Sequence, residues 1–95
     1  MILDEPCAGL DVPTRETFLR SLEKLARKRT QLIYVTHRIE EIMPCFTHVL
    51  YLKNGKVFKQ GRKEVMMNSK LLSKALDCSV MVEENYNRFY ASICQ

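Results

Sequence analysis

Two short apolar runs flank a helical pattern near the start of the chain. The first run covers residues 1–3 and the second covers residues 31–35. Continuous apolar runs of this kind are typical of strands buried in a parallel sheet. Between them, apolar residues recur every three or four positions, which predicts an amphipathic helix packed on that sheet. This apolar stripe consists of Phe18, Leu19, Leu22, Leu25 and Ala26. We therefore predict a strand–helix–strand crossover whose two strands are parallel.

The predicted helix has start and stop signals at its two ends. It is expected to begin near Val12 and Pro13, because proline is well tolerated in the first helical turn. Three cations, Arg27, Lys28 and Arg29, follow the apolar stripe and complement the negative end of the helix dipole. We interpret the stripe as core packing and not as a cofactor site.

A short helix is predicted immediately after the second strand. It is expected to cover residues 38–43 and to stop before Pro44, because proline cannot continue a helix. Its inward-facing positions are Ile39, Ile42 and Met43. Glu40 and Glu41 are interpreted as a solvated face of this helix.

The remainder of the chain predicts two β-hairpins with short helices between them. The first hairpin pairs residues 47–53 with residues 56–61 around Asn54-Gly55, a turn sequence in which both positions tolerate positive φ. His48 lies inside this hairpin and is interpreted as structural. The second hairpin pairs residues 80–84 with residues 88–93. The short helices are expected over residues 63–67 and 70–76.

Composition and charge exclude several classes of function. The 95 residues include 15 Lys and Arg against 11 Asp and Glu, and the cations are scattered or in small clusters. Aromatic residues do not alternate with these cations, so we predict no nucleic-acid partner. The four cysteines are far apart and have no metal-ligand spacing, which indicates free thiols in a reducing compartment. They are Cys7, Cys45, Cys78 and Cys94.

The sequence shows no signal for export or for membrane insertion. Met1 leads directly into strand residues and Asp4, unlike a signal peptide. No apolar stretch is long enough to span a bilayer. We therefore expect a cytoplasmic location.

The candidate chemistry lies where the two parallel strands end. Asp4 and Glu5 follow the first strand, and His37 follows the second. Both strands end at the same sheet edge, so these three side chains are expected to lie close together. Adjacent carboxylates at such an edge need a cationic partner, and a Mg²⁺-nucleotide is the natural candidate. Asp4 is then expected to hold the metal through a water, and Glu5 to orient or deprotonate an attacking water.

The first eleven residues resemble the Walker B motif and the adjoining D-loop of ATP-binding cassette (ABC) ATPases. The matching residues are Ile2-Leu3-Asp4-Glu5-Pro6 and Gly9-Leu10-Asp11. Val35-Thr36-His37 then resembles the strand end that carries the switch histidine of that family. The motifs and the helix and strand between them form a combined pattern that is far more specific than any one short motif. The segment from Thr36 to Gly61 is also similar to that of molybdate-type import cassettes.

This resemblance implies a fold and a set of residue roles. The fold is α/β, the C-terminal part of a P-loop NTPase cassette domain, with residues 1–95 forming one partial ABC ATPase domain. Asp4 is implied as the ligand of Mg²⁺, Glu5 as the catalytic base, and His37 as the contact to the γ-phosphate of ATP. Asp11 is implied in the D-loop, where it touches the second ABC ATPase domain of a nucleotide-sandwich dimer. A membrane transporter subunit is the implied further partner.

Several motifs that an ABC ATPase needs are missing from this sequence. Glycine occurs only at positions 9, 55 and 61, so no G-x-x-x-x-G-K-[ST] loop is present to cradle phosphates. The Gln loop and the Leu-Ser-Gly-Gly signature are also absent. Phosphoryl transfer depends on all of these parts together, so the chain alone is expected to be inactive.

We expect the chain to be the C-terminal portion of an ABC-type protein that hydrolyses ATP to drive transport, beginning inside the Walker B strand. The alternative is a non-catalytic truncated module that folds or self-associates without nucleotide. In either case, strand edges normally covered by the rest of a cassette would be exposed. Self-association through those edges is therefore expected.

Overall fold

The computed structural model of the chain describes residues 1–28 and 31–93. It divides into two compact units, Met1–Cys45 and Phe46–Gln95, which are described separately here. None of the helices in the described ranges is long and apolar enough to cross a membrane.

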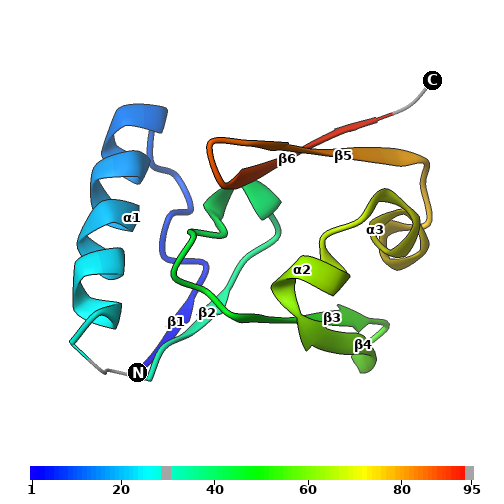
Figure 1. Ribbon diagram of the computed structural model, residues 1–95, viewed down its shortest axis with the longest axis horizontal. Helices are drawn as coiled ribbons and strands as arrows, with labels where there is room; N and C mark the ends of the chain where they lie inside the picture. Colours follow the sequence, from blue (N-terminus) through cyan, green and yellow to red (C-terminus); the bar gives the residue numbers. More distant parts are fainter. Residues whose placement is uncertain (29–30, 94–95) are drawn as a thin grey trace. The chain divides into compact units, whose positions relative to one another are not determined.

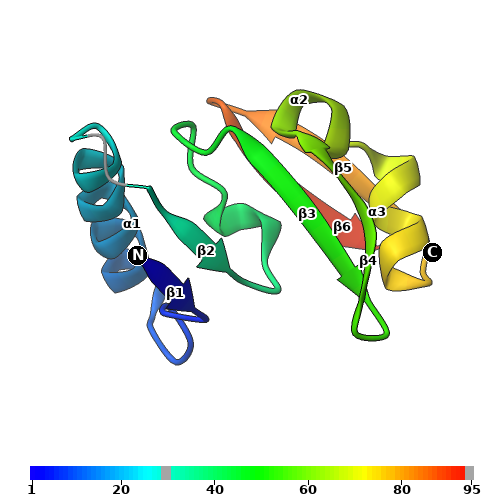
Figure 2. The same ribbon diagram turned by 90° about the horizontal axis from the view of Figure 1, so that it is seen from below.

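The first unit is built on a pair of parallel strands, β1 (Ile2–Asp4) and β2 (Ile33–Val35). Ile2 lies opposite Ile33, and Asp4 lies opposite Val35. Figure 2 shows the arrows of the two strands pointing the same way. The predicted parallel pairing is confirmed, and both strands end at one edge of the sheet. The second strand begins at Ile33, later than its predicted start at residue 31.

Helix α1 (Val12–Ala26) connects these two strands and confirms the predicted crossover helix (Figure 1). It begins at Asp11, whose Oδ1 accepts a hydrogen bond of 3.0 Å from the backbone N–H of Thr14. The centre of its apolar stripe is buried, with Leu19 at 0% and Leu22 at 6% exposure. Arg29, the last member of the predicted basic cluster, lies outside the described residues.

The short helix predicted over residues 38–43 is wrong in extent. Only one turn of 3-10 helix forms, η1 (Ile39–Glu41), and the backbone is extended at Arg38 before it and at Ile42 after it. Pro44 explains the early stop. Its ring disfavours helical backbone at the preceding residue and would clash with the carbonyl four positions back in a continued helix.

The second unit begins with the predicted hairpin, formed by β3 (His48–Lys53) and β4 (Lys56–Arg62). The two turn residues, Asn54 and Gly55, have φ values of 53° and 75°. These left-handed conformations are the reason that Asn-Gly is favoured in tight hairpins. The register shifts between Tyr51 and Leu52, which marks a β-bulge. The first hairpin is therefore confirmed.

Two short helices and a second hairpin complete this unit, as predicted. Helices α2 (Lys63–Met66) and α3 (Ser69–Leu76) lie between the β3–β4 hairpin and the hairpin of β5 (Val80–Asn85) and β6 (Arg88–Ile93) (Figure 1). Helix α3 contacts both β3 and β5. The buried apolar residues of the unit are Met66, Met67, Leu72, Val80 and Phe89. The two adjacent methionines thus fill the core.

Two serine hydroxyls of α3 close the outer edge of β5. Ser73 Oγ accepts a hydrogen bond from the N–H of Val80 at 2.9 Å and donates one to the Val80 carbonyl at 3.1 Å. Ser69 Oγ accepts a hydrogen bond from the N–H of Val82 at 2.8 Å. Because Ser69 and Ser73 are one helical turn apart, they meet alternate residues of the strand on the same side. The helix therefore replaces a neighbouring strand at this edge.

Candidate functional site

Glu5 and His37 meet at the edge where β1 and β2 end. The backbone N–H of Glu5 donates to the Val35 carbonyl at 2.8 Å, which continues the parallel pairing one residue past β1. His37 lies two residues past the end of β2. Its Nε2 atom is 3.3 Å from Glu5 Oε1. The expectation that the two strand ends bring these side chains together is confirmed for this pair.

Glu5 is held in an unusual local environment. Its φ of 48° is in the left-handed region, which is uncommon for residues other than glycine and is concentrated at functional sites. Its Oε1 atom is shielded from solvent and makes no hydrogen bond within the described part of the chain. The contact to His37 Nε2 is an ion-pair distance, and the His37 side chain itself is 92% exposed. The pair therefore combines a constrained, incompletely satisfied carboxylate with an accessible imidazole.

Asp4 is the last residue of β1 and is exposed beside Val35. The described residues contain no group of three or more His, Cys, Asp or Glu side chains that could hold a metal ion by themselves. Mg²⁺ commonly binds proteins through one or two carboxylates, with waters and substrate phosphates completing its shell. A single exposed carboxylate at this edge fits that mode of binding.

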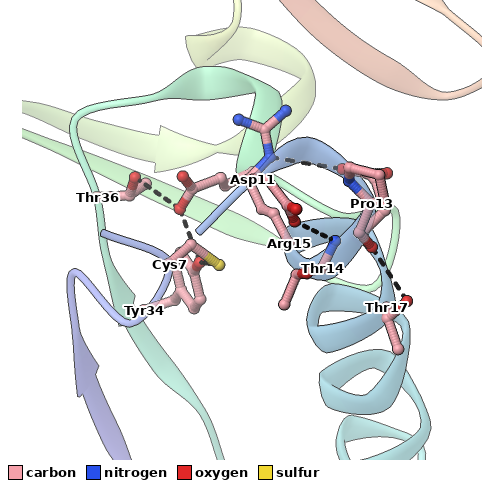
Figure 3. A network of polar contacts seen from close by, with 10 residues as sticks. Cys7, Asp11, Pro13, Thr14, Arg15, Thr17, Tyr34 and Thr36 are labelled. Carbon is pink, nitrogen blue, oxygen red and sulfur yellow. Dashed lines mark hydrogen bonds and ion pairs between the residues drawn. The ribbon is translucent and has the colours of Figure 1, made fainter. Parts of the chain in front are cut away.

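Asp11 has a structural role that is visible in the fold. Its side chain caps α1, and the hydrogen bonds from Thr14 hold the pKa of its carboxyl below the usual value (Figure 3). Ionised carboxylates are favoured at helix N-termini by the helix dipole. The carboxylate implied for a D-loop thus also fixes where the first helix begins.

A buried polar network includes Cys7, Tyr34 and Thr36, which are labelled in Figure 3. Glu41 is only 3% exposed, and its Oε1 accepts hydrogen bonds from Tyr34 Oη at 2.7 Å and from Thr36 Oγ1 at 2.9 Å. Cys7 Sγ lies 3.2 Å from the same tyrosine oxygen. The interpretation of Glu41 as part of a solvated face is therefore wrong. Its carboxylate is the centre of the network.

Burial raises the pKa of the Tyr34 hydroxyl, and its hydrogen bonds with Cys7 and Glu41 raise it further. Tyr34 therefore remains a protonated donor to Glu41. Burial also raises the pKa of Tyr51, in the second unit, to about 12. The Tyr51 hydroxyl donates to the carbonyl of Met66 at 2.8 Å and joins β3 to α2.

The sequence pattern did not reveal this network. Tyr34 lies within an apolar strand, and Glu41 lies next to another acidic residue, so neither position stands out. The available signal is weak: Tyr34 and Thr36 are two residues apart around the end of the strand, and Glu41 follows five residues later. Cys7 and Cys78 are free thiols, as predicted, and Cys7 is buried. Cys94 lies outside the described residues.

This chain is similar in sequence to known proteins over most of its length. An uncharacterized ABC transporter ATP-binding protein of Bacillus subtilis, YlmA, is 40% identical over 90 residues, which are 93% of this chain and 34% of that protein. The Lactococcus lactis protein YmeB, with the same description, is 36% identical over 92 residues, 95% of this chain and 36% of that protein. The molybdenum import ATP-binding protein ModC of Pectobacterium atrosepticum is 40% identical over 73 residues, 76% of this chain and 21% of that protein. No family model matches the chain.

A solved structure of an ABC transporter in an inward-facing conformation matches the fold with a TM-score of 0.76. The match covers 98% of this chain and 38% of that chain at 20% identity, so it supports the fold alone. The α/β arrangement of parallel strands, crossover helix, hairpin and short helices agrees with a C-terminal portion of the cassette. The chain spans about a third of the length of the curated relatives YlmA and YmeB. By sequence and fold, this chain belongs to the family of ABC transporter ATP-binding proteins.

Proposed function

We propose that this chain supplies three catalytic groups to an ABC-type ATPase: Asp4 as metal ligand, Glu5 as base and His37 as phosphate contact. The observation that carries the proposal is the 3.3 Å approach of His37 Nε2 to Glu5 Oε1 at the common end of two parallel strands. Ligand sites of open α/β sheets lie at this edge. The relatives named above are described as ATP-binding proteins, which supports ATP as the nucleotide.

Each group has a defined task in this proposal. Mg²⁺, when bound beside Asp4, neutralises charge on the phosphates of ATP. Glu5 Oε1 accepts a proton from the attacking water, and a base shielded from solvent is suited to that step. His37 Nε2 is accessible and can donate a hydrogen bond to a phosphate oxygen. Asp11, in the loop before α1, is proposed to face the second ATPase domain.

The complete protein is proposed to work at a membrane. Hydrolysis in a dimer of ATPase domains would drive transport through a membrane subunit, with the ATPase on the cytoplasmic side. The similarity to an ATP-binding protein for molybdenum import supports a role in transport. It does not identify the substrate.

The chain by itself is expected neither to bind Mg-ATP at micromolar concentration nor to hydrolyse it, because no phosphate-cradling loop occurs in the sequence. A complete cassette that contains the chain is expected to do both. Isothermal titration calorimetry and a phosphate-release assay on the two proteins measure this difference. Hydrolysis by the chain alone would show that the missing motifs are dispensable, and an inactive complete cassette would favour the non-catalytic module.

We also propose that the chain self-associates through the outer edge of β6. In the β5–β6 ladder, Val80 lies opposite Ile93 and Val82 lies opposite Ala91. The N–H groups of Val80 and Val82 point away from β6 toward α3. Directly opposed residues in an antiparallel ladder share this orientation, so the backbone groups of Ala91 and Ile93 point away from β5. Among the described residues, nothing hydrogen-bonds to them.

A second copy of β6 is the proposed partner for this edge. From Phe89 to Ile93 the strand has no charge, proline or glycine, so it lacks the features that block strand pairing. An antiparallel pair centred on Ala91 would place Ile93, which is 70% exposed, beside Phe89 of the second copy.

Ala91→Pro is expected to abolish this association. Proline removes the outward N–H while leaving the hydrogen bonds between β5 and β6 in place. Light scattering coupled to gel filtration should show a concentration-dependent dimer for the original chain and for Ala91→Ser, and a monomer for Ala91→Pro. A monomeric original chain, or a proline variant that still dimerises, would refute pairing through this strand.

A further inference from the structure

We propose that Glu41 is a positioning residue for His37 and that it acts through Thr36. This inference rests on the proposed function, in which His37 contacts the reacting phosphate. It concerns a buried carboxylate that touches neither Glu5 nor His37 in the described contacts.

Thr36 is the first link, because its hydroxyl fixes the backbone on both sides of His37. Thr36 Oγ1 donates to Glu41 Oε1 at 2.9 Å and accepts from the backbone N–H of Arg38 at 3.0 Å. The N–H of Glu41 in turn donates to the Arg38 carbonyl at 3.2 Å. Residues 36, 38 and 41 therefore form a closed set of hydrogen bonds with His37 inside it.

Glu41 also connects this loop to the segment that carries Glu5. Tyr34 Oη donates to the same Glu41 oxygen at 2.7 Å and lies 3.2 Å from Cys7 Sγ. Cys7 follows Glu5 by two residues. One carboxylate oxygen thus holds Thr36, directly before His37, and, through Tyr34, the turn after Glu5. A buried carboxylate is stable only when such donors satisfy it, so the arrangement has little freedom to change.

The position of His37 depends on its backbone because its side chain has almost no packing. The side chain is 92% exposed and touches Glu5 at 3.3 Å. Reacting groups must be placed to well within an ångström, and a displacement of about 1 Å can lower the rate about 10²-fold. Loss of the Glu41 acceptor removes one of the hydrogen bonds that fix Thr36. The backbone of the following residue, His37, and the position of its imidazole are then less constrained.

Two pairs of variants in a complete cassette test this role. Thr36→Val keeps the shape of the side chain but removes the hydroxyl, whereas Thr36→Ser keeps the hydroxyl. Glu41→Ala removes the acceptor, whereas Glu41→Gln keeps an oxygen of the same reach. We expect Thr36→Val and Glu41→Ala to lower kcat about 10- to 100-fold. The KM for ATP should be unchanged, and Thr36→Ser and Glu41→Gln should remain within a few-fold of the original kcat.

Imidazole NMR of the 95-residue chain gives a readout independent of turnover, because the chain has only two histidines. In ¹H–¹⁵N spectra, Thr36→Val and Glu41→Ala should shift or broaden the His37 signals. The His48 signals, from strand β3, should not change and serve as the internal control. His37 signals identical to those of the original chain in both variants would overturn the positioning role.

The kinetic experiment and the NMR experiment together separate this inference from the proposed function. Unchanged turnover in Glu5→Gln would defeat the proposed function, while the His37 signals would still decide whether Glu41 positions the loop. If Glu5→Gln is inactive as expected, an unchanged kcat in folded Thr36→Val would count against Glu41 and Thr36 alone. Should Glu41→Ala fail to fold, the isosteric Thr36→Val decides the question.

Discussion

Replacing Glu5 with glutamine in a complete cassette is expected to lower ATP turnover by about 10²- to 10⁴-fold, the usual contribution of a general base. The amide has nearly the same shape as the carboxylate but cannot accept the proton of the attacking water. Binding of Mg-ATP should be preserved, because the phosphates are held by other groups. Single-turnover hydrolysis and equilibrium binding, measured on the same preparations, separate these two quantities.

Glu64→Gln provides a matched control for this experiment. It makes the same carboxylate-to-amide change on helix α2, where the Glu64 side chain is 63% exposed and lies 3.5 Å from Arg62. Glu64 has no role in the proposed site, so single-turnover hydrolysis in this variant should equal that of the original protein. Full single-turnover hydrolysis in Glu5→Gln would remove Glu5 from the role of base.

Replacing Leu19 with alanine is expected to unfold the first unit. Leu19 is fully buried in α1, and truncations of this kind cost about 2–5 kcal/mol. Domains have total stabilities of only about 5–15 kcal/mol, and small ones lie at the low end of that range. The loss is therefore comparable to the whole stability of the strand–helix–strand unit. Circular dichroism during urea unfolding measures it.

Leu76→Ala is the control for this truncation. Leu76 ends helix α3 and is 56% exposed, so the same chemical change removes little buried area. Exposed substitutions usually alter stability by within about 0.5 kcal/mol. If Leu19→Ala and Leu76→Ala lowered the free energy of unfolding equally, Leu19 would not be part of a packed core.

Much of the fold follows from local pattern. The apolar runs at residues 1–3 and 31–35 were separated by a helix-period stripe, and this combination allows few alternatives to a parallel crossover. Asn54-Gly55 likewise determines a hairpin, because only residues tolerant of positive φ fit both turn positions. The second hairpin was also recovered, although its turn places Tyr86 at a φ of 53°, where a bulky side chain is unusual.

The errors occurred where tertiary contacts override local preference. Two adjacent glutamates after a histidine are most simply solvent-exposed. Glu41 is nevertheless buried, because Tyr34 in β2 and Thr36 directly after that strand supply hydroxyl donors. Those donors are invisible in sequence until the strand and the turn are placed in space. The proximity of Glu5 and His37 could be predicted because it needed only strand direction. The roles of Asp4, Glu5, Asp11 and His37 remain predictions.

The hydroxyls of Ser69 and Ser73 limit the size of an assembly that forms through the β5–β6 hairpin. They occupy one flank of the β5–β6 ribbon at Val80 and Val82, so further chains can join only at the opposite flank. When two β5–β6 hairpins pair through β6, the outer edge that remains on each hairpin is that of β5, which helix α3 covers. Growth through this hairpin is therefore expected to end at a pair and not to proceed to a fibril, because each helix α3 occupies the place that the next strand would need.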